Sequence, residues 1–347
     1  MNKALSYILM LASVLLAGCT PHVDITEEDH ACIVFDMGMD QTKSLISPSN
    51  LNTEGNRFDV YDVHTSAHSL VQYMDEQCLQ YKNGQWSFVK SADDATVIQI
   101  PWTKKGAHDF LAHNTYDASS SKPLPVEVSY TSFEDDNLLT TAKQQSLRIP
   151  ATDSWTLTKD SQFDFIYGSA TRDVATGGYA PVPISFKHLF AAIAVEVRNI
   201  STSQVTLNSL SFSNIKDKGW ATVDYSGAVS YNLSASQASN LFSQNPNPAV
   251  GIAAGKSHTL YSDFGTENAF LIWPHSVSDM DAVQIVIGYI QESSSISKTI
   301  NLSENPTIRY WGAGNKYNYL ITISDNNISF DVIKVVEWIN DDIILEE

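Results

Sequence analysis

Two histidines, His64 and His68, come closest to a catalytic or metal-binding spacing in this 347-residue chain. On a helix, side chains four residues apart share a face and can bind zinc, but the metalloprotease motif also needs a glutamate directly after the first histidine. Thr65 stands at that position. No serine lies in a G-x-S-x-G nucleophile turn either. We therefore predict that the protein is not an enzyme and uses no metal or cofactor.

A different chemistry is indicated at Cys19, one of three cysteines in the chain. It follows one lysine, an apolar run over residues 4–16 and two small residues. This is the layout of an export signal, and residues 16–19 are similar to the bacterial lipobox, in which the cysteine is acylated after cleavage. We expect residues 1–18 to be removed and Cys19 to carry a lipid anchor. The alternative is an ordinary secretory signal that contains a cysteine.

The net charge of −18 argues against a nucleic-acid partner, because phosphates require lysine and arginine. Acidic residues are also frequent in the segment 19–30, which we expect to be a solvated tether. This segment is similar to the surface-export signals of Bacteroidetes lipoproteins, although a disordered leader is an equal alternative. No segment reaches the roughly 20 apolar residues that a membrane-spanning helix needs.

Apolar and polar residues alternate along much of the chain, which is typical of half-buried β-strands. Turn-forming residues cluster between the alternating segments, and residues 324–327 predict a hairpin. Helical periodicity is scarce, and its best candidates are residues 65–74 and 234–242. The alternating segments include residues 58–60, 126–130, 193–197, 283–289 and 321–323.

We therefore predict an all-β protein. About 320 mature residues exceed one typical domain and suit two. We assign residues 31–183 to an N-terminal β-sandwich domain and residues 184–347 to a C-terminal one. The boundary lies in residues 176–183, where glycine and proline would interrupt strand pairing.

Cys32 and Cys78 are the remaining cysteines, and an exported protein can join such a pair in a disulfide. Two free buried thiols are the alternative. Seven tryptophans also suggest stacking on sugar rings, although core packing is the more common use of such residues. Trp86 and Trp102 lie in the more polar sequence surroundings and are the candidates for glycan contact.

Several segments, taken in their order along the chain, resemble the fimbrillin family, the lipoprotein pilins of Bacteroidetes type V pili. Each segment is degenerate alone, and their combination with the lipobox carries the resemblance. The segments are residues 33–35, 42–44 and 58–61, then 163–168 and 184–190 running into 194–197, and finally 311–319 with Ile328, Val332, Val335, Val336 and Trp338.

The resemblance implies two transthyretin-like Greek-key β-sandwich domains in tandem. It also implies export as a lipoprotein by the lipoprotein machinery to the outer membrane and the cell surface, followed by incorporation into a pilus. In this family a trypsin-like protease cuts after a basic residue near the first strand. Loss of that strand opens an apolar groove, and a strand from another pilin subunit fills it by β-strand complementation.

Carried over to this sequence, the cut falls between Lys43 and Ser44, where an arginine followed by alanine is commoner in the family. The displaced strand would present three apolar residues on its inner face, and the C-terminal segment would supply candidate donor residues. The inner-face residues are Ile33, Phe35 and Met37, and the candidate donor residues are Val335, Val336, Ile339 and Ile343.

Two functional readings remain open from the sequence. The first is a structural pilus subunit, at the tip, in the stalk or as an anchor, that supports adhesion to a host or bacterial surface glycan or protein. The second is a surface glycan-binding lipoprotein that never polymerises.

Overall fold

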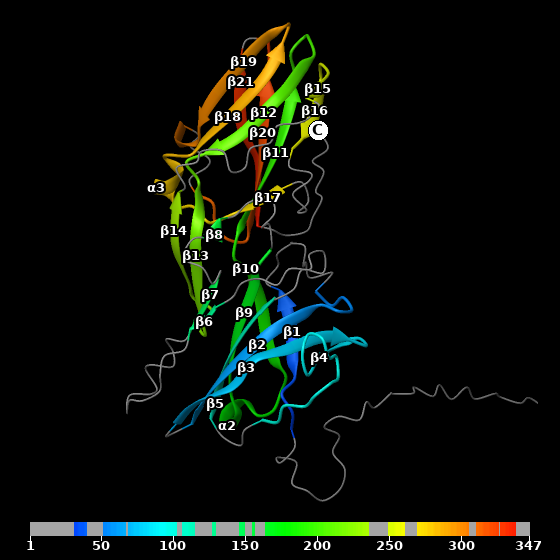
Figure 1. Ribbon diagram of the computed structural model, residues 1–347, viewed down its shortest axis with the longest axis vertical. Helices are drawn as coiled ribbons and strands as arrows, with labels where there is room; N and C mark the ends of the chain where they lie inside the picture. Colours follow the sequence, from blue (N-terminus) through cyan, green and yellow to red (C-terminus); the bar gives the residue numbers. More distant parts are fainter. Residues whose placement is uncertain are drawn as a thin grey trace, which may run out of the picture.

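The computed structural model describes residues 31–39, 51–66, 69–102, 106–114, 127–129, 146–149, 155–156, 164–235, 249–260, 269–304, 310–325 and 327–337. Strands dominate these ranges and form four sheets in an elongated molecule (Figure 1), which confirms the all-β prediction. Within the same ranges, no helix has the length and apolar character needed to cross a bilayer.

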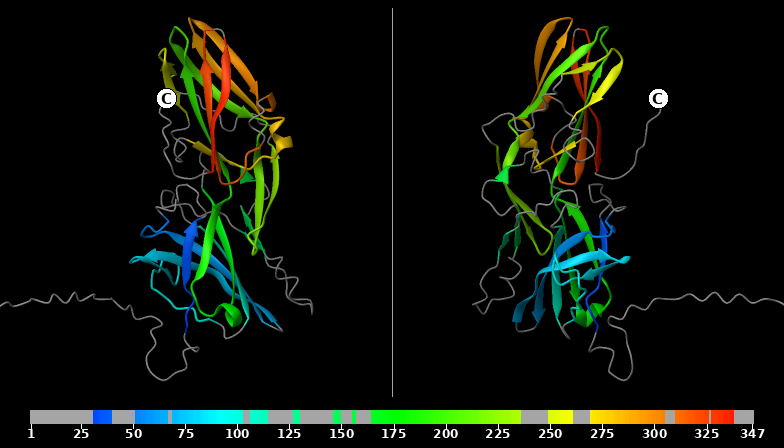
Figure 2. Two further views of the ribbon diagram at one scale, coloured as in Figure 1. Left: turned by 180° about the vertical axis from the view of Figure 1, so that it is seen from behind. Right: turned by 45° about the vertical axis from the view of Figure 1, so that its right-hand side comes forward.

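A seven-stranded sheet forms the lower end of the molecule in Figures 1 and 2. Strand β1 is parallel to β10, and every other neighbouring pair in this sheet is antiparallel. The short helix α2 (Val174–Gly177) joins β9 to β10. In spatial order the strands are β1 (Phe35–Met39), β10 (Val182–His188), β9 (Ile166–Asp173), β5 (Ala107–Asn114), β2 (Arg57–Ser66), β3 (Ser69–Lys82) and β4 (Gln85–Phe88).

Three further sheets form the upper part of the molecule (Figure 1). The first contains β16 (Lys256–Thr259), β11 (Ala191–Asn199), β20 (Asn315–Ile323) and β21 (Ile328–Glu337), with β17 (Ala269–Ile272) beside β11. The second contains β15 (Val250–Ile252), β12 (Val205–Ser213), β18 (Gln284–Gln291) and β19 (Ser294–Asn301). The third contains β14 (Val229–Ala235), β13 (Lys216–Asp224), β7 (Ser146–Ile149) and β6 (Glu127–Ser129), with β8 (Trp155–Thr156) beside β13. Two short helical turns, α3 (Val277–Met280) and η4 (Leu302–Glu304), follow β17 and β19.

The seven-stranded sheet buries apolar side chains on both faces. Phe58 and Val60 of β2 belong to a core within the lower part, together with the inner residues of β1. Tyr61 and Val63 of the same strand belong instead to the larger core that runs through the upper sheets. The lower sheet therefore packs against the upper part through a shared hydrophobic core.

The boundary predicted between residues 183 and 184 falls inside β10, and the chain leaves the lower sheet only at Leu189 and Phe190. Pro183 is compatible with this strand because an N–H at position 183 would not be needed for pairing with β1 or with β9. The neighbouring Val182 N–H donates to the Val34 carbonyl on the β1 side, so position 183 faces the opposite side, where pairing with β9 begins only at Ser185.

Strands β6, β7 and β8, which lie within the predicted N-terminal domain, pair in one sheet with β13 of the upper part. The helix predicted over residues 65–74 is wrong, because its described residues extend the β2–β3 hairpin. Thr65 lies opposite Leu70 on one side and Ala107 on the other, so pairing with two neighbours outweighs the weak helical pattern. Of the other predicted helix, residues 234 and 235 end β14 and the rest lies outside the described residues.

Two buried histidines link stability to pH. The Nδ1 atoms of His113 and His275 donate to the main-chain carbonyls of Asn114 and Trp273, at 3.1 and 2.8 Å. Burial lowers the pKa of each histidine from 6.5 to about 4. Burial acts oppositely on Asp62, whose pKa it raises to about 6.

We expect stability to fall as the pH drops from 7 to 5. In this window the unfolded chain protonates both histidines and the native state does not, so each histidine costs about 2 kcal/mol at pH 5, and Asp62 offsets only part of this loss. Urea unfolding at both pH values measures the difference, and His275→Gln should shrink it.

The matched control is His258→Gln in β16, which tests whether the loss of any histidine has the same effect. An unfolding midpoint that is unchanged or higher at pH 5 would contradict the expected linkage.

Candidate assembly site

The first described segment of the chain covers the lower core with a strictly alternating pattern of burial. Ile33, Phe35 and Met37 are only 4%, 5% and 7% exposed, whereas Val34 between them is 51% exposed. In an extended chain, successive side chains point to opposite faces, so one face of this segment closes the core and the other faces solvent.

Main-chain hydrogen bonds hold this segment on two sides. The Ile33 N–H donates to the Ile100 carbonyl at 2.8 Å, and the Trp102 N–H donates to the Ala31 carbonyl at 2.9 Å. Strand β1 continues in parallel register with β10, from Phe35 opposite Val182 to Met39 opposite Phe186. The segment is thus an integral edge of the lower sheet.

The ring of Phe35 lies between the two ends of the curved sheet. Its centroid is 5.6 Å from that of Phe88 in β4 and 5.2 Å from that of Phe110 in β5, both in edge-on geometry. Because β1 and β4 are the two outermost strands of the sheet, this contact closes the lower core. Removal of β1 would take the Phe35 ring away from both Phe88 and Phe110.

A buried polar pair supports this aromatic layer and was missed by sequence reasoning. His108 Nδ1 and Asp62 Oδ2 are 2.5 Å apart, and both side chains are fully buried. The His108 ring stacks on Phe110 at 5.7 Å, and the Trp102 ring packs edge-on against it at 5.2 Å. An aspartate in an alternating apolar strand is the only sequence signal for such a pair.

Part of the predicted assembly machinery lies outside the described residues: Cys19, Lys43, Ser44, Ile339 and Ile343. Val335 and Val336 lie in β21, where they pair with Tyr317 and Lys316 of β20. The structure therefore places these two candidate donor residues in an integral strand at the edge of its sheet.

The predicted Cys32–Cys78 disulfide is not formed between these two described residues, because Cys78 is a free, buried thiol. Cys78 lies in β3 opposite Asp59, whereas Cys32 forms an isolated bridge with Pro101, so different strand pairs hold the two. Burial, helped by the nearby Asp59 charge, raises the pKa of the Cys78 thiol to about 11. No bond from Cys78 therefore ties the first segment to the sheet.

The two tryptophans predicted as glycan contacts have different surroundings. Trp102 is only 7% exposed and packs in the lower core, so its ring is not available to a sugar, despite its polar neighbours in sequence. Trp86 is half-buried, and its indole N–H donates to the Asn52 side chain at 2.8 Å. Trp273 and Trp311 are fully buried, which is the more common use of tryptophan.

His64 lies in β2 rather than on a helix, and His68 lies outside the described residues. Among the residues that the structure describes, no group of three or more His, Cys, Asp or Glu side chains could hold a metal ion.

A family model described as fimbrillin-like matches residues 47–338. The chain belongs to the fimbrillin-like family. This membership supports a pilus or adhesin role at the cell surface and assembly with other pilin subunits. No curated protein matches the sequence.

Solved structures show the same fold for two Bacteroides proteins. A fimbrial protein from Bacteroides vulgatus ATCC 8482 is 12% identical, with a TM-score of 0.54 over 88% of this fimbrillin-like chain and 99% of that chain. A provisionally named cell adhesion protein from Bacteroides ovatus ATCC 8483 is also 12% identical, with a TM-score of 0.50 over 90% and 99% of the two chains.

We expect Phe35→Ala to destabilise this fimbrillin-like protein by about 3–5 kcal/mol, because it removes a buried ring that bridges β4 and β5. Val34→Ala, on the solvent face of the same segment, should change the free energy of unfolding by less than about 0.5 kcal/mol. Urea unfolding of the full chain measures both. Equal effects at the two positions would show that the segment is not docked in solution.

Proposed function

We propose that the protein is a structural subunit of a type V pilus, at its tip or in its stalk, that supports adhesion and has no enzymatic activity. In this proposal it is exported as a lipoprotein on Cys19, processed by a trypsin-like protease between Lys43 and Ser44, and assembled by strand exchange. The observation that carries the proposal is the alternating burial of the first segment, whose inner face covers the lower core as an edge strand.

The first segment is bound too tightly to the lower core to dissociate unaided, so assembly requires that another strand replace it. Burial of three large apolar side chains, Ile33, Phe35 and Met37, stabilises the docked segment by about 5–9 kcal/mol. A cut after Lys43 falls beyond the end of β1 and leaves those contacts in place. A second strand with alternating apolar side chains must therefore replace β1 as it leaves, and main-chain hydrogen bonds to β10 would set its register.

We expect limited trypsin digestion to cut early after Lys43 and to generate a ladder of multimers. The N-terminal fragment should stay bound to the cut monomer and leave only as multimers form, without any reducing agent, because Cys78 is free. Native mass spectrometry follows the fragment, and gel electrophoresis without boiling follows the multimers.

The processing variant is Lys43→Gln, which should remain monomeric under digestion. Its matched control is Lys90→Gln, which removes a lysine whose side chain is 69% exposed and should assemble normally. A Lys43 that resists digestion, together with polysaccharide binding by the monomer, would instead support a surface glycan-binding lipoprotein that does not polymerise.

The donor segment is tested by charge substitution at two positions. Ile339→Asp should abolish multimers and leave the thermal midpoint of the monomer unchanged, because a charge cannot occupy an apolar groove. Val335→Asp should lower that midpoint, because residue 335 lies within the β20–β21 ladder. Normal assembly of the Ile339→Asp variant would exclude this residue from the donor strand.

A further inference from the structure

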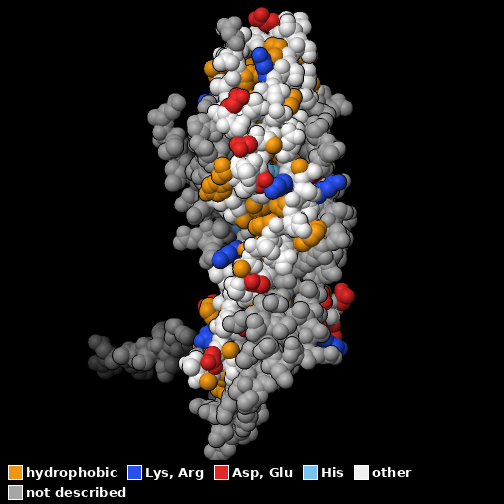
Figure 3. All heavy atoms as spheres, turned by 90° about the vertical axis from the view of Figure 1, so that its left-hand side faces the viewer, with side chains coloured by type: hydrophobic (Ala, Val, Ile, Leu, Met, Phe, Trp, Pro, Cys, Tyr) orange, Lys and Arg blue, Asp and Glu red, His pale blue; other side chains and the backbone are white. Residues whose placement is uncertain are grey.

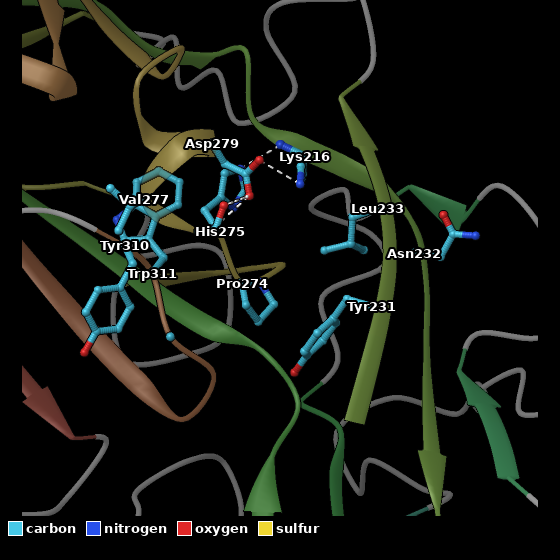
Figure 4. Close-up of a pocket in the computed structure, with 12 residues that line it drawn as sticks. Lys216, Tyr231, Asn232, Leu233, Pro274, His275, Val277, Asp279, Tyr310 and Trp311 are labelled. Atoms are coloured by element: carbon cyan, nitrogen blue, oxygen red, sulfur yellow. Dashed lines mark hydrogen bonds and ion pairs between the residues drawn. The ribbon is translucent and has the colours of Figure 1, made fainter. Parts of the chain in front are cut away.

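A cavity of about 680 Å³ lies in the upper part of the molecule, far along the chain from β1. Figure 4 shows its two sides: Tyr231 and Leu233 project from β14, and Tyr310 and Trp311 lie opposite them. His275, Lys216 and Asp279 lie between these sides. On this face of the molecule, hydrophobic side chains gather around a few charged ones (Figure 3).

Aromatic and aliphatic side chains at this cavity are open to solvent. Tyr310 is 55% exposed, Val277 is 50% exposed and Tyr231 is 36% exposed. The ring of Tyr231 is held in place because its hydroxyl donates to the Leu189 carbonyl at 3.1 Å. Behind them Trp311 is fully buried, and its indole N–H donates to the Tyr319 hydroxyl at 2.6 Å. The Tyr231 ring is therefore held against the core, and the exposed Tyr310 directly precedes the buried Trp311 in the chain.

The polar groups of the cavity are also held in fixed positions. Lys216 Nζ and Asp279 Oδ1 form an ion pair at 2.7 Å. The other carboxylate oxygen of Asp279 accepts from the Ser276 N–H and hydroxyl, at 2.9 and 2.8 Å. The Lys216 N–H donates to His275 Nε2 at 2.7 Å, and His275 Nδ1 donates to the Trp273 carbonyl at 2.8 Å. His275 therefore accepts through Nε2 and stays neutral at pH 7, because burial lowers its pKa to about 4.

This combination selects a class of ligand. The charge of Lys216 is balanced by Asp279, so the site offers no net attraction to a phosphate or a carboxylate. A wholly apolar ligand would remove water from the ion pair without replacing its hydrogen bonds, which is costly. A sugar ring has C–H groups that lie against an aromatic face and hydroxyls that both donate and accept, so it satisfies both parts of the site.

We propose that the cavity between β14 and α3 binds a neutral saccharide, with the ring of Tyr310 as its stacking surface. The hydroxyls of the sugar would bond to Lys216, Asp279 and the exposed Asn232 at the cavity. The proposal deepens the adhesion part of the proposed function by giving the ligand class, and it is independent of strand exchange. It also places glycan contact at residues other than Trp86 and Trp102.

The test is a glycan array carrying neutral and acidic oligosaccharides, probed with the full mature chain. Binding glycans are then titrated by saturation-transfer NMR. Neutral glycans should bind, with transfer to their ring C–H protons. Tyr310→Ala should weaken binding by about tenfold or more. Tyr310→Phe keeps the ring and should retain binding. The matched distant control is Ile290→Ala, which removes another exposed apolar side chain from β18 and should bind normally.

The proposal would be overturned if no neutral glycan bound on the array, if binding were restricted to acidic glycans, or if the Tyr310→Ala variant bound like the parent protein. Displacement of the saccharide by an extended peptide with higher affinity would also overturn it, in favour of a protein partner at β14. Multimer formation after trypsin is measured on the same preparations. Multimers without glycan binding would refute the ligand inference and leave the pilus role intact.

Discussion

The inner face of the first segment is the contact on which the lower part of the molecule depends. An edge strand usually carries charge or is kept short to discourage unwanted pairing. Here the outermost strand instead has an inner face as buried as a central strand, with Phe35 closing the gap between the two ends of the sheet. The core is complete only while a strand with alternating apolar side chains occupies this position.

The surrounding side chains and the rest of the sheet keep the position of β1 well defined. Phe110, His108 and Trp102 form a layer beneath β1, and the Asp62 carboxylate holds the histidine by a buried hydrogen bond. This bond uses one carboxylate oxygen of Asp62 and fixes the orientation of the histidine ring in the core. The opposite face of the same sheet is packed into the upper core, so the sheet that β1 borders is supported by both parts of the molecule.

The first segment and the cavity between β14 and α3 lie at different places in the molecule. Strand β1 belongs to the lower sheet, whereas β14 and α3 belong to the upper part (Figure 1). The contacts at the two places also differ. Main-chain hydrogen bonds and apolar side chains hold β1 in the sheet, whereas side-chain hydrogen bonds hold the polar groups of the cavity in position. In the proposed function, a subunit with this layout joins its neighbours through one end and presents a ligand site on another face.

Alternation of apolar and polar residues was enough to locate strands such as β2, β11, β18 and β20, because apolar side chains at alternate positions of each pack into a core. With the turn residues 324–327, it also indicated the β20–β21 hairpin, in which the Ser324 N–H donates to the Asn327 carbonyl. The inner residues of β1 came instead from the family resemblance. The order of short segments along the chain was enough to indicate the family. These properties depend on local sequence, so the sequence by itself determined them.

Pairing between distant segments was decided only by the tertiary structure. The parallel pairing of β1 with β10, the joining of β6, β7 and β8 to β13, and the strand conformation of Thr65 all depend on partners far away in the chain. The burial of Trp102 and the free thiol of Cys78 have the same origin, as does the gathering of Lys216, Asp279 and Tyr310 at one cavity. The local sequence pattern shows which residues are apolar and which carry a reactive group. The partners of each residue are selected by the free energy of the whole packed core.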